Sequence, residues 1–495
     1  MGCSVNFFYV RSTRGALVAA LIAVVAIATT AYAGTRGPSA SSMLKDNAAS
    51  GKPNIVLIVT DDMRTDELQF MPKTWELLVE KGVEFTNAIS PHPLCCPARA
   101  ELVSGQYGQN SGVQHNEGPW GGFQAMIEPD QNIGRWLHAV GYQTSYHGKY
   151  LNGYEHSRPL VAPEGWTTWD AQLTGIYTYN RGRFFNGDNI TDQYVTHTMV
   201  ERSGTAIAEF SAGGAPFFTV INHVAPHVTL APPHLPVAED KYADAYSDLR
   251  PPVFDSPAFN EPEVGDLPKS LRRPPVSRER IAELFRARVR SLLSVDDAVA
   301  ETVAELDKLG ELDNTYIIFT SDNGYALGEH HLQGKNYLVD EVLDVPLVIR
   351  GPGYTPGTVE DMPVTLVDVV ATIADWSDAV PGQPVDGLSI ERMRDHNRRL
   401  RDTILVQTGD RLRDSTPGWA FRGVSTDRYL FGYRAGEPSK GILFDRRLDP
   451  DALRNRFWDP DYRRIRDELT RRTEILSRCS GGDCSHVFGA LPPVS

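Results

Sequence analysis

The hydrophobic residues of this chain are concentrated in short runs rich in valine and isoleucine, and most of these runs lead into polar or charged residues. The first run, Asn-Ile-Val-Leu-Ile-Val at 54–59, is followed by Thr-Asp-Asp. Strands that are apolar on both faces are typical of a parallel sheet covered by helices on either side. The same pattern predicts further strands at 83–85, 142–146, 217–221, 316–320 and 345–349.

Segments with helical periodicity separate these strands. We expect helices at 72–81, 132–140, 281–309 and 366–376, and a glycine directly follows each of the first three. The alternation of strands and helices predicts an α/β fold, a doubly wound domain with a mostly parallel central sheet. A segment rich in proline and charge at 231–278 is expected to form a long surface insertion near the functional site.

The character of the chain changes near residue 390, after a stretch at 381–387 that is rich in proline and glycine. Four short strand patterns follow, at 403–406, 419–424, 428–433 and 441–444. A final helical pattern has one apolar face, formed by Tyr462, Ile465, Leu469 and Leu476. We therefore expect a main α/β domain at 53–390, which carries the functional site, and a smaller C-terminal domain at 391–495, an antiparallel sheet packed by one helix.

The first 33 residues form a separate unit. Arg11 and Arg14 precede an apolar run that closes on Ala-Tyr-Ala before Gly34. This order describes a secretory signal peptide at 1–33, which implies a secreted or extracytoplasmic protein. The alternative is an uncleaved membrane anchor, because the run approaches the ~20 residues that span a bilayer. Residues 34–52 are expected to form a flexible leader, and no later stretch is apolar enough for stable membrane insertion.

The formal net charge of −14 argues against a nucleic-acid partner, because a general nucleic-acid binder shows a basic footprint. A pocket for a small anionic substrate is compatible with this charge, since a few local cations can dominate its potential. The hydrophobic content of 41% and the charged content of 23% are those of an ordinary globular protein with a sizeable core.

The chain has five cysteines, of which Cys3 leaves with the signal peptide. Cys479 and Cys484 enclose Ser-Gly-Gly-Asp, a loop flexible enough for a local disulfide bond in an exported protein. Cys95 and Cys96 then lack obvious partners, and a vicinal disulfide between them would be strained.

The segment around Cys95 combines a reactive residue type with the start of a helix. Pro97 suits a first helical turn, which places Cys95 at the helix N-terminus, where free N–H groups and the helix dipole favour negative charge. Arg99 would lie on the same face one turn later and could reach back to Cys95. A cysteine among positive groups is a reactive position, whereas the alternative is a buried structural pair of thiols.

Polar residues collect at the carboxyl ends of the predicted strands, where open α/β sheets bind their ligands. Four of them are candidate oxygen ligands of a metal: Asp61, Asp62, Asp322 and Asn323. This donor set suits Ca²⁺ or Mg²⁺ better than zinc, while the alternative for the first two acids is that they cap the next segment. Four basic residues could surround a tetrahedral oxyanion, namely Arg99, Lys149, His227 and Lys335. A single lysine or histidine is more often a solvated or core residue, so the case depends on their shared location at strand ends.

These motifs resemble those of the type I sulfatases, and the resemblance covers nearly the whole mature chain. Its strongest part is Cys-Cys-Pro-Ala-Arg at 95–99, continued to Ser104 and Gly105. The other matching segments are Val-Thr-Asp-Asp at 59–62, Gly-Lys-Tyr-Leu-Asn-Gly at 148–153, Ala-Pro-His at 225–227, Ser-Asp-Asn-Gly-Tyr at 321–325 and Gly-Glu-His at 328–330 through Lys335. The doubled cysteine, the Lys-Tyr-Leu-Asn segment and the Cys479/Cys484 pair resemble the N-acetylglucosamine-6-sulfatase branch.

The resemblance implies an alkaline-phosphatase-like fold and hydrolysis of sulfate monoesters, either of sugars such as N-acetylglucosamine 6-sulfate or of aryl alcohols. It implies that a formylglycine-generating enzyme oxidises Cys95, and that the hydrated aldehyde attacks sulfur as a gem-diol in two-step covalent catalysis. The implied ligands of Ca²⁺, or of Mg²⁺, are Asp61, Asp62, Asp322, Asn323 and the modified Cys95. The implied catalytic roles are a contact to the gem-diol for Arg99, contacts to sulfate oxygens for Lys149 and Lys335, and help in protonating the leaving group for His227.

The chain departs from the family pattern at two positions. Ser104 stands where the longer signature usually has threonine, and Leu151 stands where many sulfatases have a histidine two residues after the strand-end lysine. The base that deprotonates the gem-diol is therefore open, with His147 and Asn152 as neighbours that could compensate. Asn152 and His330 are also candidates for substrate binding, and the alternative for His330 is a surface position.

Other functions are compatible with part of this pattern. A phosphate or phosphonate ester hydrolase of the same fold usually has a serine or threonine nucleophile, two metals and additional His and Asp ligands, a set that cannot be assembled here. A non-catalytic protein of this fold could bind sulfated glycans without turnover. A redox or structural role for Cys95 and Cys96 predicts that both cysteines matter equally, whereas the sulfatase interpretation predicts that only Cys95 is essential.

Overall fold

The structure is a computed structural model, and it describes residues 51–191, 193–396, 400–410 and 418–494. The predicted signal peptide and nearly all of the predicted leader lie outside these residues. Within them, no helix combines the length and the apolar character needed to cross a membrane.

A ten-stranded sheet forms the centre of the α/β region, with β1 paired in parallel to β8 on one side and to β9 on the other. In order across the sheet the strands are β13 (Thr358–Glu360), β2 (Val83–Phe85), β12 (Leu347–Arg350), β9 (Thr315–Ser321), β1 (Asn54–Thr60), β8 (Phe217–Asn222), β4 (Gln143–Lys149), β5 (Thr168–Thr174), β6 (Arg181–Phe184) and β7 (Asn189–Thr191). The pairs that involve β12, and those of β6 with its two neighbours, are antiparallel, while the others are parallel. The predicted mostly parallel sheet is confirmed.

The helices of the described residues match most of the predicted ones. They are α2 (Pro72–Thr74), which continues as a π-helical turn over Trp75–Val79, α3 (Cys95–Ser104), α4 (Gly108–Ser111), α5 (Ile133–Ala139), α6 (Val195–Gly213), α7 (Arg278–Lys308), α8 (Asp340–Leu343), α9 (Leu366–Ser377), α10 (Ile390–Asp395) and α11 (Arg463–Leu476). Side-chain caps mark the starts of α5 and α7, since Asn132 accepts a hydrogen bond from the Arg135 N–H and Ser277 accepts one from the Arg280 N–H. Helix α7 begins at Arg278, three residues before its predicted start.

Helix α6 is absent from the predicted elements. Its sequence contains threonines, serines and two glycines, which are weak helix formers in isolation. Burial of Met199, Ile207 and Phe210 against the sheet stabilises it instead. Tertiary packing therefore overrides local propensity in this segment.

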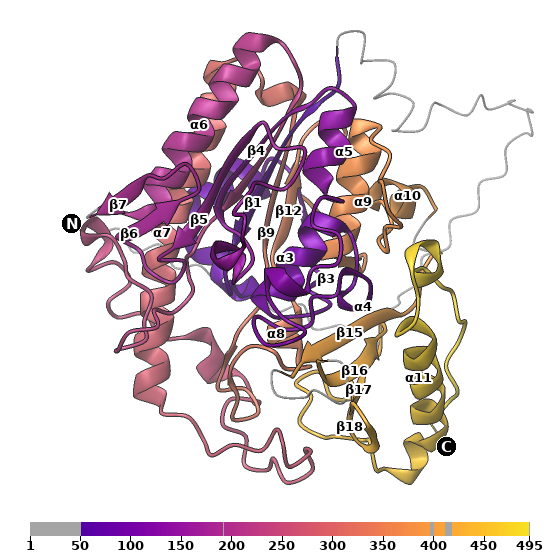
Figure 1. Cartoon of the computed structure of the whole chain (residues 1–495). Helices are drawn as coiled ribbons and strands as arrows, with labels where there is room; N and C mark the ends of the chain where they lie inside the picture. Colours follow the sequence, from indigo (N-terminus) through magenta and orange to yellow (C-terminus); the bar gives the residue numbers. More distant parts are fainter. Residues whose placement is uncertain (1–50, 192, 397–399, 411–417, 495) are drawn as a thin grey trace, which may run out of the picture. The chain divides into compact units, whose positions relative to one another are not determined.

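The two faces of the central sheet are covered by different helices, as Figure 1 shows for α3, α5 and α9 on one face and for α6 and α7 on the other. Alternation along β1 explains this arrangement. Ile55, Leu57 and Val59 pack with the first group of helices, whereas Val56 and Ile58 pack with the second. All five side chains are at most 1% exposed, so each stabilises the fold by about 1.5–3 kcal/mol through burial.

The C-terminal region folds as a four-stranded antiparallel sheet of β15 (Ile404–Gly409), β16 (Trp419–Ser425), β17 (Tyr429–Arg434) and β18 (Glu437–Asp445). Ile465, Leu469 and Leu476 of α11 pack against it, as their spacing predicts. Cys479 and Cys484 form the predicted disulfide bond. Two small pairings complete the described strands, β3 (Ala88–Ile89) with β14 (Val364–Thr365) and β10 (Ala326–Leu327) with β11 (Gln333–Gly334).

The predicted insertion at 231–278 contains only short 3-10 turns as regular structure, at Asp240–Tyr242 and Pro252–Asp255. Part of it is nonetheless buried, because Leu267 and Leu271 pack in one cluster with residues of the C-terminal sheet. The segment is therefore integrated with the C-terminal sheet and is not wholly a surface loop.

Candidate active site

The carboxyl ends of β1 and β9 meet at one edge of the sheet, where Thr60 lies opposite Ser321. The four predicted metal ligands follow these two residues directly and are all buried: Asp61, Asp62, Asp322 and Asn323. The backbone N–H of Asp62 donates a hydrogen bond to Oδ1 of Asp322, at 3.0 Å. Parallel pairing of the two strands thus brings together acids that lie about 260 positions apart in the chain.

Asp62 adopts a positive φ of 74°, which is unfavourable for a residue other than glycine. The surrounding hydrogen bonds hold it there, since Asn323 donates from Nδ2 to Asp62 Oδ1 at 2.8 Å. Strained conformations of this kind concentrate at functional sites.

Cys95 is the first residue of α3, and the helix starts as Pro97 predicts. Its thiol is fully buried, and Sγ accepts a hydrogen bond from Lys335 Nζ at 2.7 Å and donates one to Asp61 Oδ1 at 3.5 Å. Burial raises the pKa of Cys95 to about 12, although Lys149 and Lys335 oppose this rise. The side chain is therefore a neutral thiol near pH 7 and not a ready thiolate nucleophile.

Arg99 lies one turn further along α3 and is 1% exposed. Its guanidinium donates to Asp322 Oδ2 from Nε, at 2.9 Å, and from Nη1 to Lys149 O and Asn222 Oδ1. Burial opposes its charge, but Asp322 and Asp61 raise the pKa of Arg99 above its usual value. We expected Arg99 to reach back to Cys95. Its hydrogen bonds instead hold Asp322 of the carboxylate cluster, Asn222 and the end of β4.

Two lysines bring positive charge to the same point. Lys149, at the end of β4, forms an ion pair with Asp61, and Lys335 forms one with Asp62. Burial works against both ammonium groups, yet the adjacent carboxylates raise the pKa of each lysine, so both stay charged. Gly148 precedes the first lysine with a φ of 95°, and a Cβ there would meet the Asn222 carbonyl oxygen, so only glycine allows this strand end.

His227 completes the cluster. Its Nδ1 donates to the carbonyl of Val228 at 2.6 Å, which leaves the lone pair on Nε2, 3.7 Å from Asp62 Oδ2. Burial, reinforced by the nearby Lys335, lowers the pKa of His227 to about 4. The imidazole is therefore neutral in this arrangement and acts as an acceptor at Nε2.

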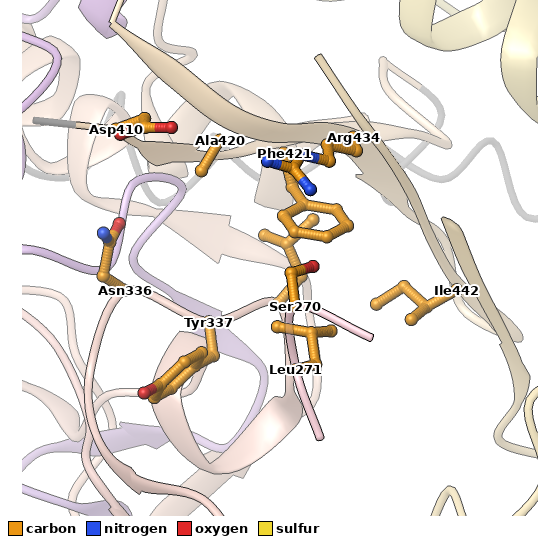
Figure 2. Close-up of a pocket in the computed structure, with 10 residues that line it drawn as sticks. Ser270, Leu271, Asn336, Tyr337, Asp410, Ala420, Phe421, Arg434 and Ile442 are labelled. Carbon is orange, nitrogen blue, oxygen red and sulfur yellow. The ribbon is translucent and has the colours of Figure 1, made fainter. Parts of the chain in front are cut away.

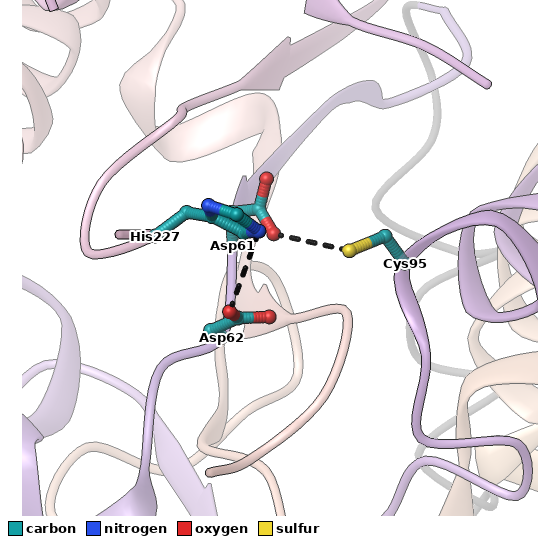
Figure 3. Close-up of side chains that lie close together, drawn as sticks. All are labelled: Asp61, Asp62, Cys95 and His227. Carbon is teal, nitrogen blue, oxygen red and sulfur yellow. Dashed lines mark hydrogen bonds and ion pairs between the residues drawn. The ribbon is translucent and has the colours of Figure 1, made fainter. Parts of the chain in front are cut away.

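The carboxylate and amide oxygens at these strand ends suit a hard divalent cation. Asp61, Asp62, Cys95 and His227 each offer one atom, and these atoms lie within 4.8 Å of one another (Figure 3). Among the described residues, the buried atoms Asp62 Oδ2 and Asn323 Oδ1 have no hydrogen-bond partner. Burial and the charge of Asp61 raise the pKa of Asp322 to about 6, so a cation would relieve repulsion among the carboxylates. His227 lies beside these oxygen donors, with Nε2 3.7 Å from Asp62 Oδ2.

The remaining predicted residues lie in different surroundings. Asn152 borders the cluster, and its backbone N–H donates a hydrogen bond to Cys96 Sγ at 3.1 Å. Leu151 is buried in the hydrophobic core, and His147 Nδ1 lies 3.7 Å from Asp170. His330 is also buried and hydrogen bonds to Glu261 at 2.7 Å. The structure thus brings Asn152 to the site, while His330 is hydrogen bonded to Glu261 and His147 lies next to Asp170.

Tyr177 is a site residue that no sequence motif indicates. Its ring centroid lies 4.5 Å from that of His227 and 4.6 Å from Lys149 Nζ, and its hydroxyl accepts a hydrogen bond from Asn152 Nδ2 at 2.7 Å. It belongs to the turn between β5 and β6, and only the folded sheet brings that turn beside β4 and β8.

A separate cavity of about 160 Å³ lies between the chain after Lys335 and the C-terminal sheet (Figure 2). It is lined by Ser270, Leu271, Asn336, Tyr337, Leu338, Asp410, Ala420, Phe421, Arg434 and Ile442. None of the predicted site residues lines this cavity, so it is separate from the cluster around Cys95.

Comparison with known proteins identifies relatives of this chain. The family described as Sulfatase matches residues 53–379, and the family described as N-sulphoglucosamine sulphohydrolase, C-terminal, matches residues 328–478. The chain is 33% identical to the N-acetylglucosamine-6-sulfatase of Homo sapiens, over 88% of this chain and 86% of that protein. It is 29% identical to an arylsulfatase of Volvox carteri, over 90% of this chain and 78% of that protein.

Solved structures show the same fold. A protein in complex with its substrate D-glucosamine-2-N,6-O-disulfate superposes with a TM-score of 0.71 at 18% identity, covering 86% of this chain and 97% of that chain. The predicted alkaline-phosphatase-like architecture is thereby confirmed. Because the family model matches residues 53–379 and the human relative is 33% identical over most of both chains, this chain belongs to the sulfatase family, the hydrolases of sulfate esters.

Proposed function

We propose that this sulfatase cleaves sulfate monoesters of sugars, such as N-acetylglucosamine 6-sulfate units, with aryl sulfates as simpler substrates. The observation that carries the proposal is the position of Cys95, whose Sγ lies between Lys335 Nζ and the Asp61 carboxylate at the start of α3. The human relative is named for the 6-sulfate of N-acetylglucosamine, and the related solved structure holds a sulfated glucosamine.

In this proposal Cys95 is converted to formylglycine by a formylglycine-generating enzyme. In the structure, the Sγ of the unmodified cysteine marks the position of one hydroxyl oxygen of the hydrated aldehyde. That hydroxyl is the proposed nucleophile that attacks the sulfur atom of the substrate. A buried thiol with a pKa raised to about 12 does not supply such a group at neutral pH. The position at a helix N-terminus adds about 0.3–1 kcal/mol for a bound anion, so most of the stabilisation comes from the charged side chains.

The proposed metal is Ca²⁺, with Mg²⁺ as the second choice. Asp61, Asp62, Asp322 and Asn323 would hold it through oxygen, together with the side chain derived from Cys95. When bound, the cation supplies positive charge beside the sulfate oxygens and polarises them. The ion pair of Lys335 with Asp62 places a second positive charge at the same point.

The other side chains have separate tasks. Lys149 and Lys335 bind sulfate oxygens as buried, permanently charged donors. Arg99 positions Asp322 and the end of β4 through its three hydrogen bonds. His227 exchanges a proton with the leaving alcohol at Nε2, since Nδ1 is occupied by the Val228 carbonyl, and a bound sulfate anion favours the protonated imidazole.

The relatives named as extracellular sulfatases support a location outside the cytoplasm, consistent with the predicted signal peptide. The disulfide bond between Cys479 and Cys484 agrees with an oxidising compartment.

Two assays test the proposal. Steady-state hydrolysis of 4-nitrophenyl sulfate is compared with that of 4-nitrophenyl phosphate, and we expect the sulfate to be preferred. A preference for phosphate would favour a phosphate or phosphonate ester hydrolase.

Cys95→Ala is expected to lower kcat at least about 10³-fold, as the loss of a covalent nucleophile does. Unchanged turnover in this variant would contradict the mechanism, and sulfated-glycan binding without turnover in the wild type would identify a binding protein.

A further inference from the structure

A groove of about 1330 Å³ opens beside the candidate active site. Its walls are the turn and strand ends at 173–182, the segment 229–237 and residues on the chain just after β4. This volume exceeds the roughly 300–1,000 Å³ of pockets that enclose a drug-sized ligand. The groove can therefore hold more than one sugar ring.

The groove and the catalytic cluster share a wall. Asn152, Tyr177 and Tyr179 line the groove. The ring of Tyr177 lies against His227, and the hydroxyl of Tyr179 donates to the His227 carbonyl at 2.6 Å. The wall of the groove therefore packs directly against His227.

The lining of the groove carries almost no net charge. Among the described residues that line it, Glu155 and Arg181 are the formally charged ones, one of each sign, and the others, His156 among them, carry no formal charge. Leu230 and Val237 expose apolar surface along it, at 68% and 36% of their area. The buried cations of the site, Lys149 and Lys335, are already paired with carboxylates of the catalytic cluster.

We propose that this groove binds the alcohol portion of the substrate, an inference that rests on the proposed function. The substrate is then an oligosaccharide that carries one sulfate ester and is otherwise uncharged. Apolar and aromatic walls suit the hydrophobic faces of neutral sugar rings, and the tyrosine and asparagine groups can bind their hydroxyls. A polysulfated chain would bring further negative charges into a groove without matching cations, in a protein of net charge −14.

The test compares two tetrasaccharides built on N-acetylglucosamine, one with a single 6-sulfate and one sulfated on every ring. We expect kcat/KM to be at least about tenfold higher for the monosulfated chain, since each unmatched sulfate weakens binding. Leu230→Arg adds a cation to the groove wall and should narrow this ratio by about two- to fivefold, the scale of one partly exposed charge. The matched control is Val359→Arg on β13, at the opposite edge of the sheet from β5 and β6, which should leave the ratio unchanged.

A binding measurement separates this proposal from the proposed function. Calorimetry with the unsulfated tetrasaccharide should show binding to the wild type and to Cys95→Ala, and weaker binding to Leu230→Arg. A preference for the polysulfated chain, equal effects of Leu230→Arg and Val359→Arg, or no binding of the neutral chain would overturn the groove assignment. Failure of every sulfate ester to react, with neutral-chain binding intact, would instead overturn the proposed function and leave the groove as a glycan site.

Discussion

Lys335 donates a hydrogen bond from Nζ to Sγ of Cys95 over 2.7 Å, although the two residues lie 240 positions apart in the chain. The same ammonium group is paired with Asp62. This contact places a permanently charged donor on the side chain that we propose as the nucleophile. It also links the start of α3 to the end of β1, so one side chain contacts both the proposed nucleophile and the proposed cation site.

Lys335→Met should therefore lower kcat on 4-nitrophenyl sulfate by about 10²–10³, the usual loss when a donor to a developing negative charge is removed. It should also destabilise the fold, because Asp62 loses a buried partner. Thermal unfolding measured beside the kinetics separates the two effects. The matched control is Lys73→Met, whose ammonium pairs with Asp297 away from the site. Equal kcat values for Lys335→Met and wild type would contradict the assigned role.

Removal of divalent cations should lower both activity and melting temperature. Three buried carboxylates repel one another, and a bound cation stabilises the folded state by about 2.7 kcal/mol when present at one hundred times its Kd. The protein is treated with a chelator, dialysed and then titrated with Ca²⁺ or Mg²⁺. Scanning calorimetry gives the melting temperature at each metal concentration. Asp322→Asn should reduce the calcium-dependent shift. A melting temperature that is indifferent to millimolar Ca²⁺ would show that the cluster holds no such ion.

Tyr177 should matter through its ring more than through its hydroxyl. Tyr177→Phe keeps the contacts to Lys149 and His227 and loses only the hydrogen bond from Asn152, a change of about 0.5–1.5 kcal/mol. Tyr177→Ala also removes the aromatic ring from the groove wall and should raise KM more than it lowers kcat. Kinetics on a sugar sulfate and on an aryl sulfate would show this difference, and identical kinetics for the Phe and Ala variants would refute it.

The two neighbouring cysteines should respond differently to substitution. Cys95→Ala removes the proposed nucleophile, whereas the buried Sγ of Cys96 accepts the Asn152 N–H and donates to the Asn116 carbonyl oxygen. Cys96→Ala is expected to lower stability by about 1–2 kcal/mol and to retain measurable turnover. Cys96→Ser, which keeps an acceptor, serves as its control. Loss of activity in Cys96→Ala as complete as in Cys95→Ala would instead support a joint redox or structural role.

His330 should make stability depend on pH. Burial lowers its pKa, but Glu261, hydrogen bonded at Nδ1, together with the charges of Glu341 and Glu329, raises the pKa above its ordinary value. A raised histidine pKa adds stability that is complete below about 6.5 and is lost as pH rises through the folded-state pKa.

The melting temperature of Glu261→Gln should accordingly fall further below wild type at pH 6 than at pH 9. In a His330→Gln background, the effect of Glu261→Gln should no longer depend on pH. A difference between wild type and Glu261→Gln that grows with pH would mean that His330 is not the charged partner.

The strand-end residues could be predicted because two physical rules act locally. Apolar runs such as 54–59 identify buried parallel strands, and parallel strands gather their carboxyl-end residues at one edge. These two rules together assign Asp61 and Asp322 to one site from the sequence alone. The start of α3 at Cys95 was likewise predictable from the proline two residues later.

Other features depend on packing that no local pattern encodes. Arg99 bonds to Asp322, which lies 223 positions away in the chain. A carboxylate is a better partner for the guanidinium than the neutral Cys95 thiol. Tyr177 lies in a turn without any motif, and α6 contains weak helix formers that only burial stabilises. His330 falls within a family motif, yet its ring nitrogen is bonded to Glu261, which comes from the insertion at 231–278.

The central claim is that Cys95 acts as something other than a cysteine. The most direct measurement is the mass of the proteolytic peptide that contains Cys95 and Cys96, from protein produced in a host with a formylglycine-generating enzyme and shown to hydrolyse an aryl sulfate. We predict an aldehyde in place of the Cys95 thiol and an unmodified Cys96. A fully active protein in which Cys95 retains its thiol would contradict the account.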